Sequence, residues 1–316
     1  MAALVSIIVN NYNYGRFVGE AIESALGQTY RNTEIIVVDD GSRDNSREVI
    51  AGYGSRIIPV LKENGGQGSA FNAGFAASRG EYVLFLDSDD LLEANAIETV
   101  MREWTEGAAR VYFQLQAVGL RGEPLGRTIG GSATPSALLG PFVTPSSSGT
   151  VFSRQSLERI MPISEREWRI CADYYLCAAS SLFGATERIG QPLGKYRIHG
   201  QNNFQVGEPL AKVRNLINLN LKLHGSLSPL MTGGEIGSLE QWLGNSPEHW
   251  FRRIISLREG PRDHPWPDSI VGLTTRAVRA AWRRPGWRFR QRLACSIQAI
   301  SYGLIPGKAQ SLLSKY

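Results

Sequence analysis

The sequence predicts an α/β fold in which a mainly parallel sheet is flanked by helices and followed by a helical C-terminal extension. Three observations lead to this fold class. Apolar runs of four to six residues alternate with segments of helical periodicity over residues 1–92, which is typical of a parallel sheet with both faces covered. Polar clusters follow the ends of these runs, and a helical pattern resumes after Pro209.

Four strands are predicted first, because each segment is a short apolar run bounded by polar residues or glycine. They cover residues 4–9, 34–38, 57–61 and 82–86. Three helices are predicted between them, and Asp44 or Asn45 is a typical cap for the second. These helices cover residues 17–26, residues 46–53, and the segment from the glycine-rich turn at 64–68 through residue 77.

The alternation becomes weaker after residue 110. A strand is predicted at residues 111–118, a helix at 174–183 and a short strand or extended segment at 195–199. Residues 130–149 are rich in Gly, Pro, Ser and Thr, a composition that predicts a loop. We expect this loop to cross over a functional site.

A polar segment follows each of the four predicted strands. These segments are residues 10–13, 39–42, 63–68 and 87–90. Parallel strands bring their carboxyl ends to one edge of a sheet, and open α/β sheets bind ligands beyond that edge. We therefore expect the four segments to converge on one ligand-binding rim.

The most informative segment reads Y-V-L-F-L-D-S-D-D from Tyr82 to Asp90. It places Asp87, Asp89 and Asp90 close together, and carboxylates at this spacing repel one another unless a cation compensates them. Oxygen ligands suit Mg²⁺ or Mn²⁺ rather than zinc, with water and substrate phosphates as further ligands. The alternative is an acidic cap, formed by Asp90, for a helix that begins near Asn95.

Composition argues against several classes of protein. Three cysteines without a C-x-x-C pair argue against a disulfide scaffold or a zinc site and suit a reducing cytosol. No apolar stretch is long enough for a membrane-spanning helix, and the apolar start lacks a basic region and a cleavage site, so it is typical of a first strand rather than a signal peptide. We expect a cytoplasmic protein.

Two common nucleotide-binding patterns are absent. The turn after the first strand reads N-N-Y-N-Y-G instead of G-x-G-x-x-G, and the chain has no Walker A sequence, so a hydride-transfer function loses its main support. The turn from Gly65 to Gly68 follows the third strand and predicts a tight turn before a helix. Its backbone N–H groups could still bind a phosphate.

Five motifs occur in a specific order. They are V-S-I-I-V-N-N-Y-N at the start, V-V-D-D-G-S at 37–42, G-E-Y-V-L-F-L-D-S-D-D at 80–90, A-D-Y-Y-L at 172–176 and K-Y-R-I-H-G-Q-N at 195–202. This combination resembles the inverting family 2 glycosyltransferases, which have a GT-A, Rossmann-like nucleotide-diphospho-sugar fold. The resemblance covers residues 4–203. It implies a catalytic domain at 1–205, with a nucleotide-binding half at 1–92 and an acceptor-binding half at 93–205, before a helical basic region at 206–316.

The resemblance implies a donor site for a nucleotide-diphospho-sugar, with UDP as the usual nucleotide. Asn10, Tyr12 and Asp39 match positions that grip the base, and Asp87, the first residue of the D-x-D motif, lies near the ribose or sugar. Many members have an arginine where this chain has Phe71, so its contact with the diphosphate is either replaced, by Lys62 or Gln67, or absent.

The resemblance also implies a metal site and a catalytic base. Asp89 and His199 match the metal-ligand positions for Mn²⁺ or Mg²⁺. Asp173 matches the base that deprotonates the attacking acceptor hydroxyl, although Ala172 stands where many members have glutamate. The alternatives are a structural histidine at position 199 and a helix N-cap at Asp173.

Acceptor contacts are predicted at Ser148 and Gly149, within residues 145–149, and at Trp168, which could stack on a sugar. An ordinary polar loop and a core tryptophan are the alternatives.

From Arg252 to the end, thirteen Lys or Arg stand against three Asp or Glu, and arginines alternate with Trp and Phe over residues 277–299. This pattern predicts an amphipathic helix on an anionic membrane surface, or else a solvated helical face or a helix that packs on the protein. No nucleic-acid motif accompanies the charge, so we expect no nucleic acid partner.

The sequence thus predicts a metal-dependent inverting glycosyltransferase. It would move a sugar from a UDP-sugar to a hydroxyl of a glycan or lipid-linked acceptor in cell-surface polysaccharide synthesis, at the cytoplasmic face of a membrane. A nucleotidyltransferase is one alternative, but it would usually have a basic glycine-rich signature after the first strand. A catalytically silent protein that binds sugar nucleotides or glycans is the other.

Overall fold

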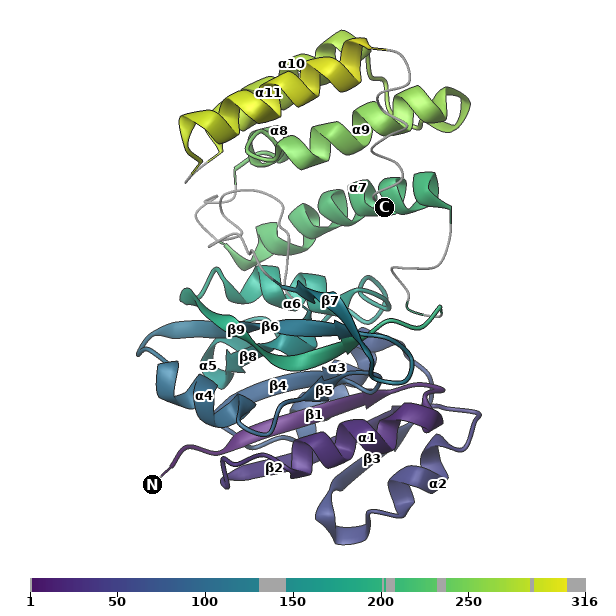
Figure 1. Cartoon of the computed structure of the whole chain (residues 1–316), viewed down its shortest axis with the longest axis vertical. Helices are drawn as coiled ribbons and strands as arrows, with labels where there is room; N and C mark the ends of the chain where they lie inside the picture. The colour runs from purple at the N-terminus through teal and green to yellow at the C-terminus, as the bar shows by residue number, and fades with distance from the viewer. Residues whose placement is uncertain are drawn as a thin grey trace. The chain divides into compact units, whose positions relative to one another are not determined.

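The computed structural model describes residues 2–130, 146–200, 202, 208–231, 237–284 and 287–305. The chain divides into two compact units, the first ending at His199 and the second continuing from Gly200. The first is an α/β unit and the second is helical (Figure 1). The domain boundary predicted at residue 205 lies outside the described residues.

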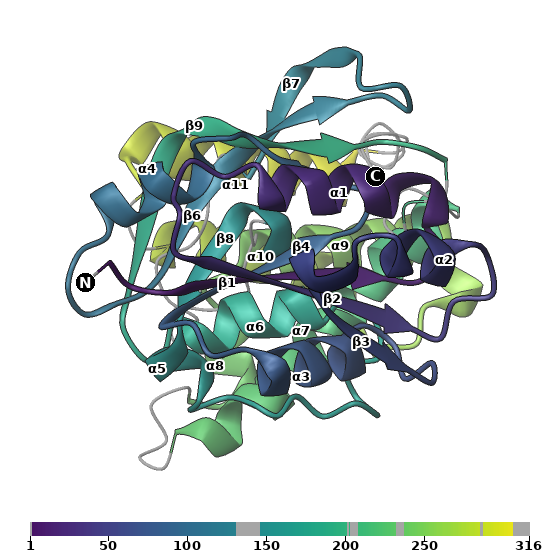
Figure 2. The ribbon, with the colours of Figure 1, turned by 90° about the horizontal axis from the view of Figure 1, so that it is seen from below.

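The first half of the sheet is parallel, as predicted. Its order is β3 (Ile58–Lys62), β2 (Thr33–Asp40), β1 (Val5–Asn11) and β4 (Tyr82–Asp87), and every neighbouring pair is parallel (Figure 2). The connecting helices are α1 (Gly15–Leu26), α2 (Ser46–Ala51) and α3 (Gln67–Ala77). All seven predicted elements are confirmed, with ends that differ by a few residues.

The second half makes the sheet mixed rather than parallel throughout. From β4 the order continues through β8 (Thr150–Ser153), β6 (Ala108–Val118), β9 (Ala185–Arg197) and β5 (Leu91–Leu92), while β7 (Pro124–Ile129) pairs with β6. In this half of the described sheet β6 and β9 are parallel, whereas β4 with β8, β6 with β8, β6 with β7 and β5 with β9 are antiparallel. Strand β9 begins ten residues before the predicted segment, because Thr, Glu, Arg and Pro interrupt its apolar pattern.

Helices cover both faces of this sheet, so its central strands are buried on both sides. On one face, α1 and α4 (Ala96–Glu103) pack against a cluster that includes Ile7, Val37 and Leu84. The other face carries α3, with α6 (Ala172–Ser180) and α5 (Arg154–Leu157) beside it. This double burial explains why the strands are continuous apolar runs in the sequence.

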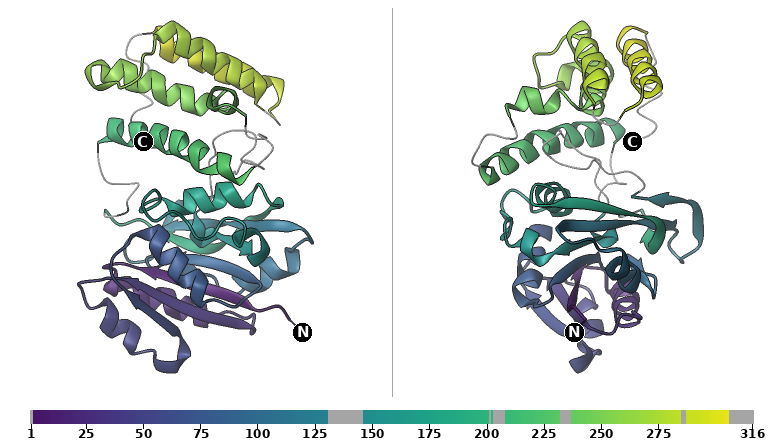
Figure 3. Two further views of the ribbon diagram at one scale, coloured as in Figure 1. Left: turned by 180° about the vertical axis from the view of Figure 1, so that it is seen from behind. Right: turned by 90° about the vertical axis from the view of Figure 1, so that its left-hand side faces the viewer.

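The second unit is helical, as expected for the C-terminal region. It contains α7 (Pro209–Leu227), α8 (Leu239–Leu243), α9 (Pro247–Glu259), α10 (Ile270–Arg283) and α11 (Phe289–Leu304), with α9, α10 and α11 side by side (Figure 3). The predicted amphipathic segment at 277–299 therefore comprises parts of two helices. None of the helices in the described part of the chain combines the length and apolar character that crossing a membrane requires.

Candidate active site

The carboxyl ends of the four parallel strands meet at one edge, as the sequence predicted. Asn10 of β1 lies opposite Asp87 of β4, and Asn11 lies opposite Asp39 of β2. Asp40 in turn pairs with Lys62 of β3. This register places the polar segments that follow the strands side by side.

The acidic cluster follows β4 in a tight turn, in which the N–H of Asp90 donates to the carbonyl oxygen of Asp87 at 3.0 Å. Burial, together with the nearby charge of Asp89, raises the pKa of both Asp87 and Asp90. A cation bound at Asp89 would relieve this repulsion. The suggestion that Asp90 caps a helix is wrong, because Asp90 accepts from the N–H of Arg197 at 3.1 Å and α4 begins only at Ala96.

Asp89 and His199 come from distant parts of the chain and meet at the rim. The Nε2 atom of His199 lies 2.9 Å from Oδ2 of Asp89, and the rings of Tyr14 and Phe17 pack on the imidazole at 5.3 and 5.1 Å. Two ligands at right angles on a Mg²⁺ ion, each about 2.1 Å away, lie about 3 Å apart. The 2.9 Å distance is that of a hydrogen bond between the two side chains, and it also matches the spacing of neighbouring ligands on one divalent ion.

The residues fit a divalent ion that takes most of its ligands from water and phosphate. No group of three or more His, Cys, Asp or Glu side chains suited to a metal occurs among the described residues. Asp89 and His199 would be the protein ligands, which agrees with the way Mg²⁺ is commonly held by one or two protein groups together with substrate phosphates.

Arg197 is a residue of this site that the sequence argument missed. Its side chain is almost fully buried, and Nε donates to the backbone oxygen of Asp89 at 3.0 Å. The other guanidinium nitrogens donate to Leu120 O at 2.9 Å and to Glu20 at 2.6 Å. Arg197 thus fastens the end of β9 to the acidic turn and so positions His199, two residues later. The sequence could have identified Arg197 through its position in the K-Y-R-I-H motif, two residues before His199.

Two tyrosines also face the acidic cluster and were not predicted. Burial, followed by the charges of Asp89 and Asp87, raises the pKa of Tyr14 to about 12. Burial and the charges of Asp90, Asp87, Asp89 and Asp173 raise the pKa of Tyr196 further. Both phenols therefore stay protonated at neutral pH and can donate hydrogen bonds at the rim.

Asp173 lies in the first turn of α6 and faces the same region as Asp87, whose pKa its charge helps to raise. Burial raises the pKa of Asp173 itself, and the N–H groups of Tyr174 and Asp173 partly offset this effect. The N-cap position belongs to Cys171, which has a left-handed backbone with φ 62°. Asp173 is therefore the second residue of the helix and not its N-cap.

Gln67 connects the start of α3 to the start of α6. Its Oε1 accepts from the N–H of Ala172 at 2.8 Å, and its side chain helps to stabilise the ionised form of Asp87. Gln67 therefore lies between the acidic turn and Asp173, at the predicted rim.

Asp39, which is predicted to bind the nucleobase, is held in place by three hydrogen bonds. Its fully buried carboxylate accepts from Asn11 Nδ2 at 3.0 Å, Ser42 N at 3.0 Å and Arg47 Nε at 2.8 Å. Burial acts to raise its pKa, but these hydrogen bonds lower it overall. Asp39 is thus held as a carboxylate at the end of β2.

Asn10 and Tyr12 differ in exposure. The Oδ1 atom of Asn10 is buried and has no hydrogen-bond partner in the described part of the chain, and a buried acceptor of this kind points to a missing ligand or water. Tyr12 is 43% exposed, so its ring can receive a stacked base.

The backbone N–H groups of the glycine-rich turn already donate hydrogen bonds within the protein. This corrects the expectation that they could bind a phosphate. Gly65 N and Gly66 N donate to the carboxylate of Asp40 at 2.9 and 2.7 Å. Gln67 N and Gly68 N donate to the carbonyl oxygens of Arg169 and Trp168. Lys62, a predicted phosphate contact, pairs with Asp40 at 2.7 Å. The turn thus anchors α3 rather than offering free N–H groups.

The predicted acceptor residues have mainly structural contacts. Ser148 is fully buried, and its hydroxyl accepts from Asp87 N at 3.1 Å. A Cβ on Gly149 would lie 2.9 Å from the carbonyl oxygen of Phe113. Trp168 is 1% exposed and stacks on Tyr175 at 5.2 Å, so its ring is not open to a sugar, and the alternative of a core tryptophan is favoured. Residues 131–145, which include most of the predicted loop, lie outside the described residues.

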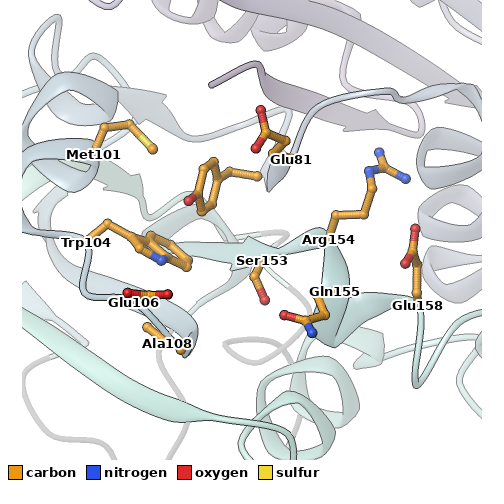
Figure 4. A pocket seen from close by; sticks show the side chains of 11 residues that line it. Glu81, Met101, Trp104, Glu106, Ala108, Ser153, Arg154, Gln155 and Glu158 are labelled. Atoms are coloured by element: carbon orange, nitrogen blue, oxygen red, sulfur yellow. The ribbon is translucent and has the colours of Figure 1, made fainter. Parts of the chain in front are cut away.

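A cavity of about 610 Å³ lies at the opposite edge of the sheet, where β4 and β6 begin (Figure 4). The rings of Tyr82 and Trp104, 4.5 Å apart, form part of its wall. Glu81, Glu106 and Glu158 contribute carboxylates to its lining. The cavity contains none of the residues predicted for the site.

Arg110 of β6 is a buried cation that the sequence argument did not identify. Its side chain is fully buried, and its three guanidinium nitrogens make no hydrogen bond within the described chain apart from a weak contact with the thiol of Cys177. Burial lowers its pKa, and the thiol of Cys177 on α6 partly offsets that effect. Such a group costs stability, because its lost hydration is not replaced.

We expect Arg110→Met to raise the free energy of unfolding by about 1–4 kcal/mol, because an apolar chain replaces a poorly compensated charge. Urea titration measures the change. Arg154→Met is the matched control and should destabilise, since the Arg154 guanidinium donates to Gly80 O at 2.6 Å and Ser78 Oγ at 2.7 Å. A marked loss of stability in Arg110→Met would mean that the guanidinium is compensated after all.

Comparison with known proteins adds sequence relationships. The model of the family described as "Glycosyl transferase family 2" matches residues 6–161. A protein of Nostoc sp. named an uncharacterized glycosyltransferase is 36% identical over 216 residues, which cover 63% of this chain and 66% of the relative. A Rickettsia typhi protein of the same description is 52% identical over 95 residues, or 30% of each chain. These matches span at most about two thirds of the relatives' own length.

Solved structures share the fold. TarS of S. aureus, residues 1–349 in complex with UDP-GlcNAc, gives a TM-score of 0.53 at 15% identity, covering 94% of this chain and 91% of TarS. The mannosyltransferase PcManGT from Pyrobaculum calidifontis, in complex with GDP-Man and Mn²⁺, gives a TM-score of 0.53 at 15% identity, covering 99% of this chain and 88% of that protein. The predicted GT-A type of fold is confirmed.

Proposed function

Since the chain belongs, through residues 6–161, to glycosyl transferase family 2, we propose that it is a metal-dependent inverting glycosyltransferase using a nucleotide-diphospho-sugar donor. One observation carries this proposal. The fold brings Asp87 and Asp89 from the end of β4 together with His199 from beyond β9, and Asp173 faces the same rim from the start of α6.

We propose that Asp89 and His199 hold Mn²⁺ or Mg²⁺. When bound, such an ion supplies a positive charge that stabilises the negative charge on the departing diphosphate. Arg197 keeps the two ligands in register through its bond to the backbone of Asp89. Tyr14 and Tyr196, whose phenols stay protonated, can donate to oxygens of the donor.

The donor in this proposal is a UDP-sugar. Asp39 accepts from the imide N–H of the base, Tyr12 stacks on the ring, and the unpaired Oδ1 of Asn10 accepts a hydrogen bond from the nucleoside. Asp87 and Gln67 lie toward the sugar and the diphosphate. The fold-level likeness to TarS with UDP-GlcNAc and to a mannosyltransferase with GDP-Man supports a nucleotide-sugar and leaves the base to experiment.

Asp173 is the proposed general base. The acceptor hydroxyl attacks the anomeric carbon on the face opposite the diphosphate and passes its proton to the Asp173 carboxylate. A new carbon–oxygen bond forms as the bond to the diphosphate breaks, so a single displacement inverts the anomeric configuration. Ser148 supports this step by binding the N–H of Asp87 and so holding the acidic turn in place.

For the acceptor we propose a glycan or lipid-linked hydroxyl in cell-surface polysaccharide synthesis, used at the cytoplasmic face of a membrane. The basic C-terminal helices support this part of the proposal, because they would bring the catalytic unit to a membrane-bound acceptor.

Calorimetric titration with UDP tests the donor site. We expect UDP to bind in the presence of Mn²⁺ and to bind at least about tenfold more weakly without it, because an ion held by Asp89 and His199 would supply positive charge for the diphosphate. GDP and dTDP serve as comparisons for the base. Tighter binding of GDP or dTDP than of UDP would mean that the donor sugar carries that nucleotide instead. If none of the three diphosphates binds, the proposed function is contradicted and a catalytically silent member of the family is favoured.

A further inference from the structure

Helix α11 exposes a stripe of large apolar side chains. Phe289, Leu293, Ile297, Ile300 and Leu304 are between 43% and 64% exposed. At 3.6 residues per turn these five positions fall within about 80° of the helix circumference. The stripe is therefore continuous along the whole helix.

A different face of α11 already makes the packing contacts of the second unit. Cys295, Ser296, Ala299 and Gly303 are buried, and a Cβ on Gly303 would collide with Thr274 of α10. The exposed stripe is thus not the side by which α11 joins the helical unit. A row of exposed large apolar residues, unlike single ones, usually marks an interaction surface.

The stripe extends onto α10 through an aromatic pair. Trp282 is 44% exposed, and its ring lies 5.8 Å from that of Phe289 in an edge-on arrangement. Trp and Phe beside aliphatic residues are typical of helices that lie in the interface of a bilayer.

The charged residues of α10 and α11 themselves are all positive. Residues 269–316 contain nine Lys or Arg and no Asp or Glu. Arg279, Arg283 and Arg290 are exposed, and within the described part of the chain none of them forms an ion pair. These cations are free to bind an anionic partner, and basic side chains near an anionic bilayer are attracted to its lipid phosphates.

We propose that the α11 stripe, together with Trp282, docks on an anionic lipid surface, with Arg279, Arg283 and Arg290 among the lipid phosphates. The apolar stripe alone would also suit a second copy of the chain. However, the like charges that border it would oppose each other across a twofold interface, whereas they complement an anionic membrane. The further idea that docking brings the catalytic unit to a lipid-linked acceptor rests on the proposed function; the docking itself does not.

Sedimentation with vesicles tests the surface. The full chain should bind vesicles of phosphatidylcholine and phosphatidylglycerol at least about tenfold more tightly than pure phosphatidylcholine vesicles, and this preference should fall as salt rises. The variant Leu293→Ser/Ile297→Ser/Ile300→Ser should lose at least about tenfold in affinity for the mixed vesicles, since each removes apolar surface from the bilayer. Leu125→Ser, which alters an apolar residue 42% exposed on β7 of the first unit, is the control and should bind unchanged.

Light scattering and UDP titration complete the test. A monomer that loses only vesicle binding in the triple variant supports the proposal, whereas a dimer that dissociates in that variant assigns the stripe to a second copy. Equal binding of mixed vesicles by the triple variant would overturn the proposal. Because Mn²⁺-dependent UDP binding is measured on the same samples, failure of docking can be distinguished from failure of the proposed enzymatic function.

Discussion

Asp173→Asn is expected to lower kcat for sugar transfer by about 10²–10⁴-fold, the usual contribution of a general base. The amide keeps the size of the side chain but cannot take the proton of the acceptor hydroxyl. Donor affinity should change little, because the proposed contacts with the metal and the nucleobase come from residues at or just beyond the ends of β1, β2, β4 and β9. Steady-state kinetics measure the first effect, and UDP calorimetry measures the second.

The pH profile sharpens this prediction. Because burial raises the pKa of Asp173, a larger fraction of the base is protonated at low pH, and kcat/KM of the wild type should rise with pH as the carboxyl ionises. Asp173→Asn should lose this dependence. Glu158→Gln, which alters an exposed carboxylate of the same unit, is the control and should retain both the rate and the profile. Transfer by Asp173→Asn at the native rate would show that another group is the base.

Asp89→Asn is expected to weaken UDP binding in the presence of Mn²⁺ by at least about tenfold, to the level of the wild type without the ion, since even the loss of a group that supports a metal ligand costs 10–100-fold in metal affinity. The amide can still hydrogen-bond to His199 but supplies no negative charge to the ion. UDP titrations with and without Mn²⁺ should therefore give the same weak affinity in this variant.

Stability measurements separate this loss from misfolding. Asp89 raises the pKa of both Asp87 and Asp90 by repulsion, so the metal-free Asp89→Asn protein should be at least as stable as the wild type. Glu93→Gln is the control, because Glu93 forms only a half-exposed pair with Lys195 at 3.5 Å, and it should bind UDP as the wild type does. Unchanged Mn²⁺ dependence in Asp89→Asn would place the ion elsewhere.

The first half of the sheet could be predicted because its signals are local. Each strand is a short apolar run that ends in a polar segment, and four such runs in a parallel sheet must bring their ends to one edge. That reasoning placed Asn10, Asp39 and Asp87 side by side, and the register bears out the arrangement. Strand β9 was mostly missed, since its first ten residues pack against β6 without an apolar pattern of their own.

Other differences arise where one side chain could have several partners. The sequence shows that Asp90 is polar and that Gly66 allows a turn. It does not show that Asp90 accepts a hydrogen bond from the N–H of Arg197, or that Gly66 donates one to the carboxylate of Asp40. Trp168 could equally have covered a sugar or the core. Such choices depend on which segments come together, and the contacts of Gly66 and Asp90 join residues 26 and 107 positions apart.

By itself, the sequence determined the class of the fold and the edge of the sheet at which the polar segments meet, because both follow from short-range patterns of apolar and polar residues. Only the tertiary structure decided which groups meet there. In the folded chain Asp89 contacts His199, and Arg197 donates to the backbone of Asp89. The N–H groups of Gly65 and Gly66 bind the carboxylate of Asp40, and the α11 stripe stays exposed. The physical reason is that hydrogen bonds and burial are satisfied by whichever partner the packed chain brings within reach, and that partner is not encoded in the neighbouring sequence.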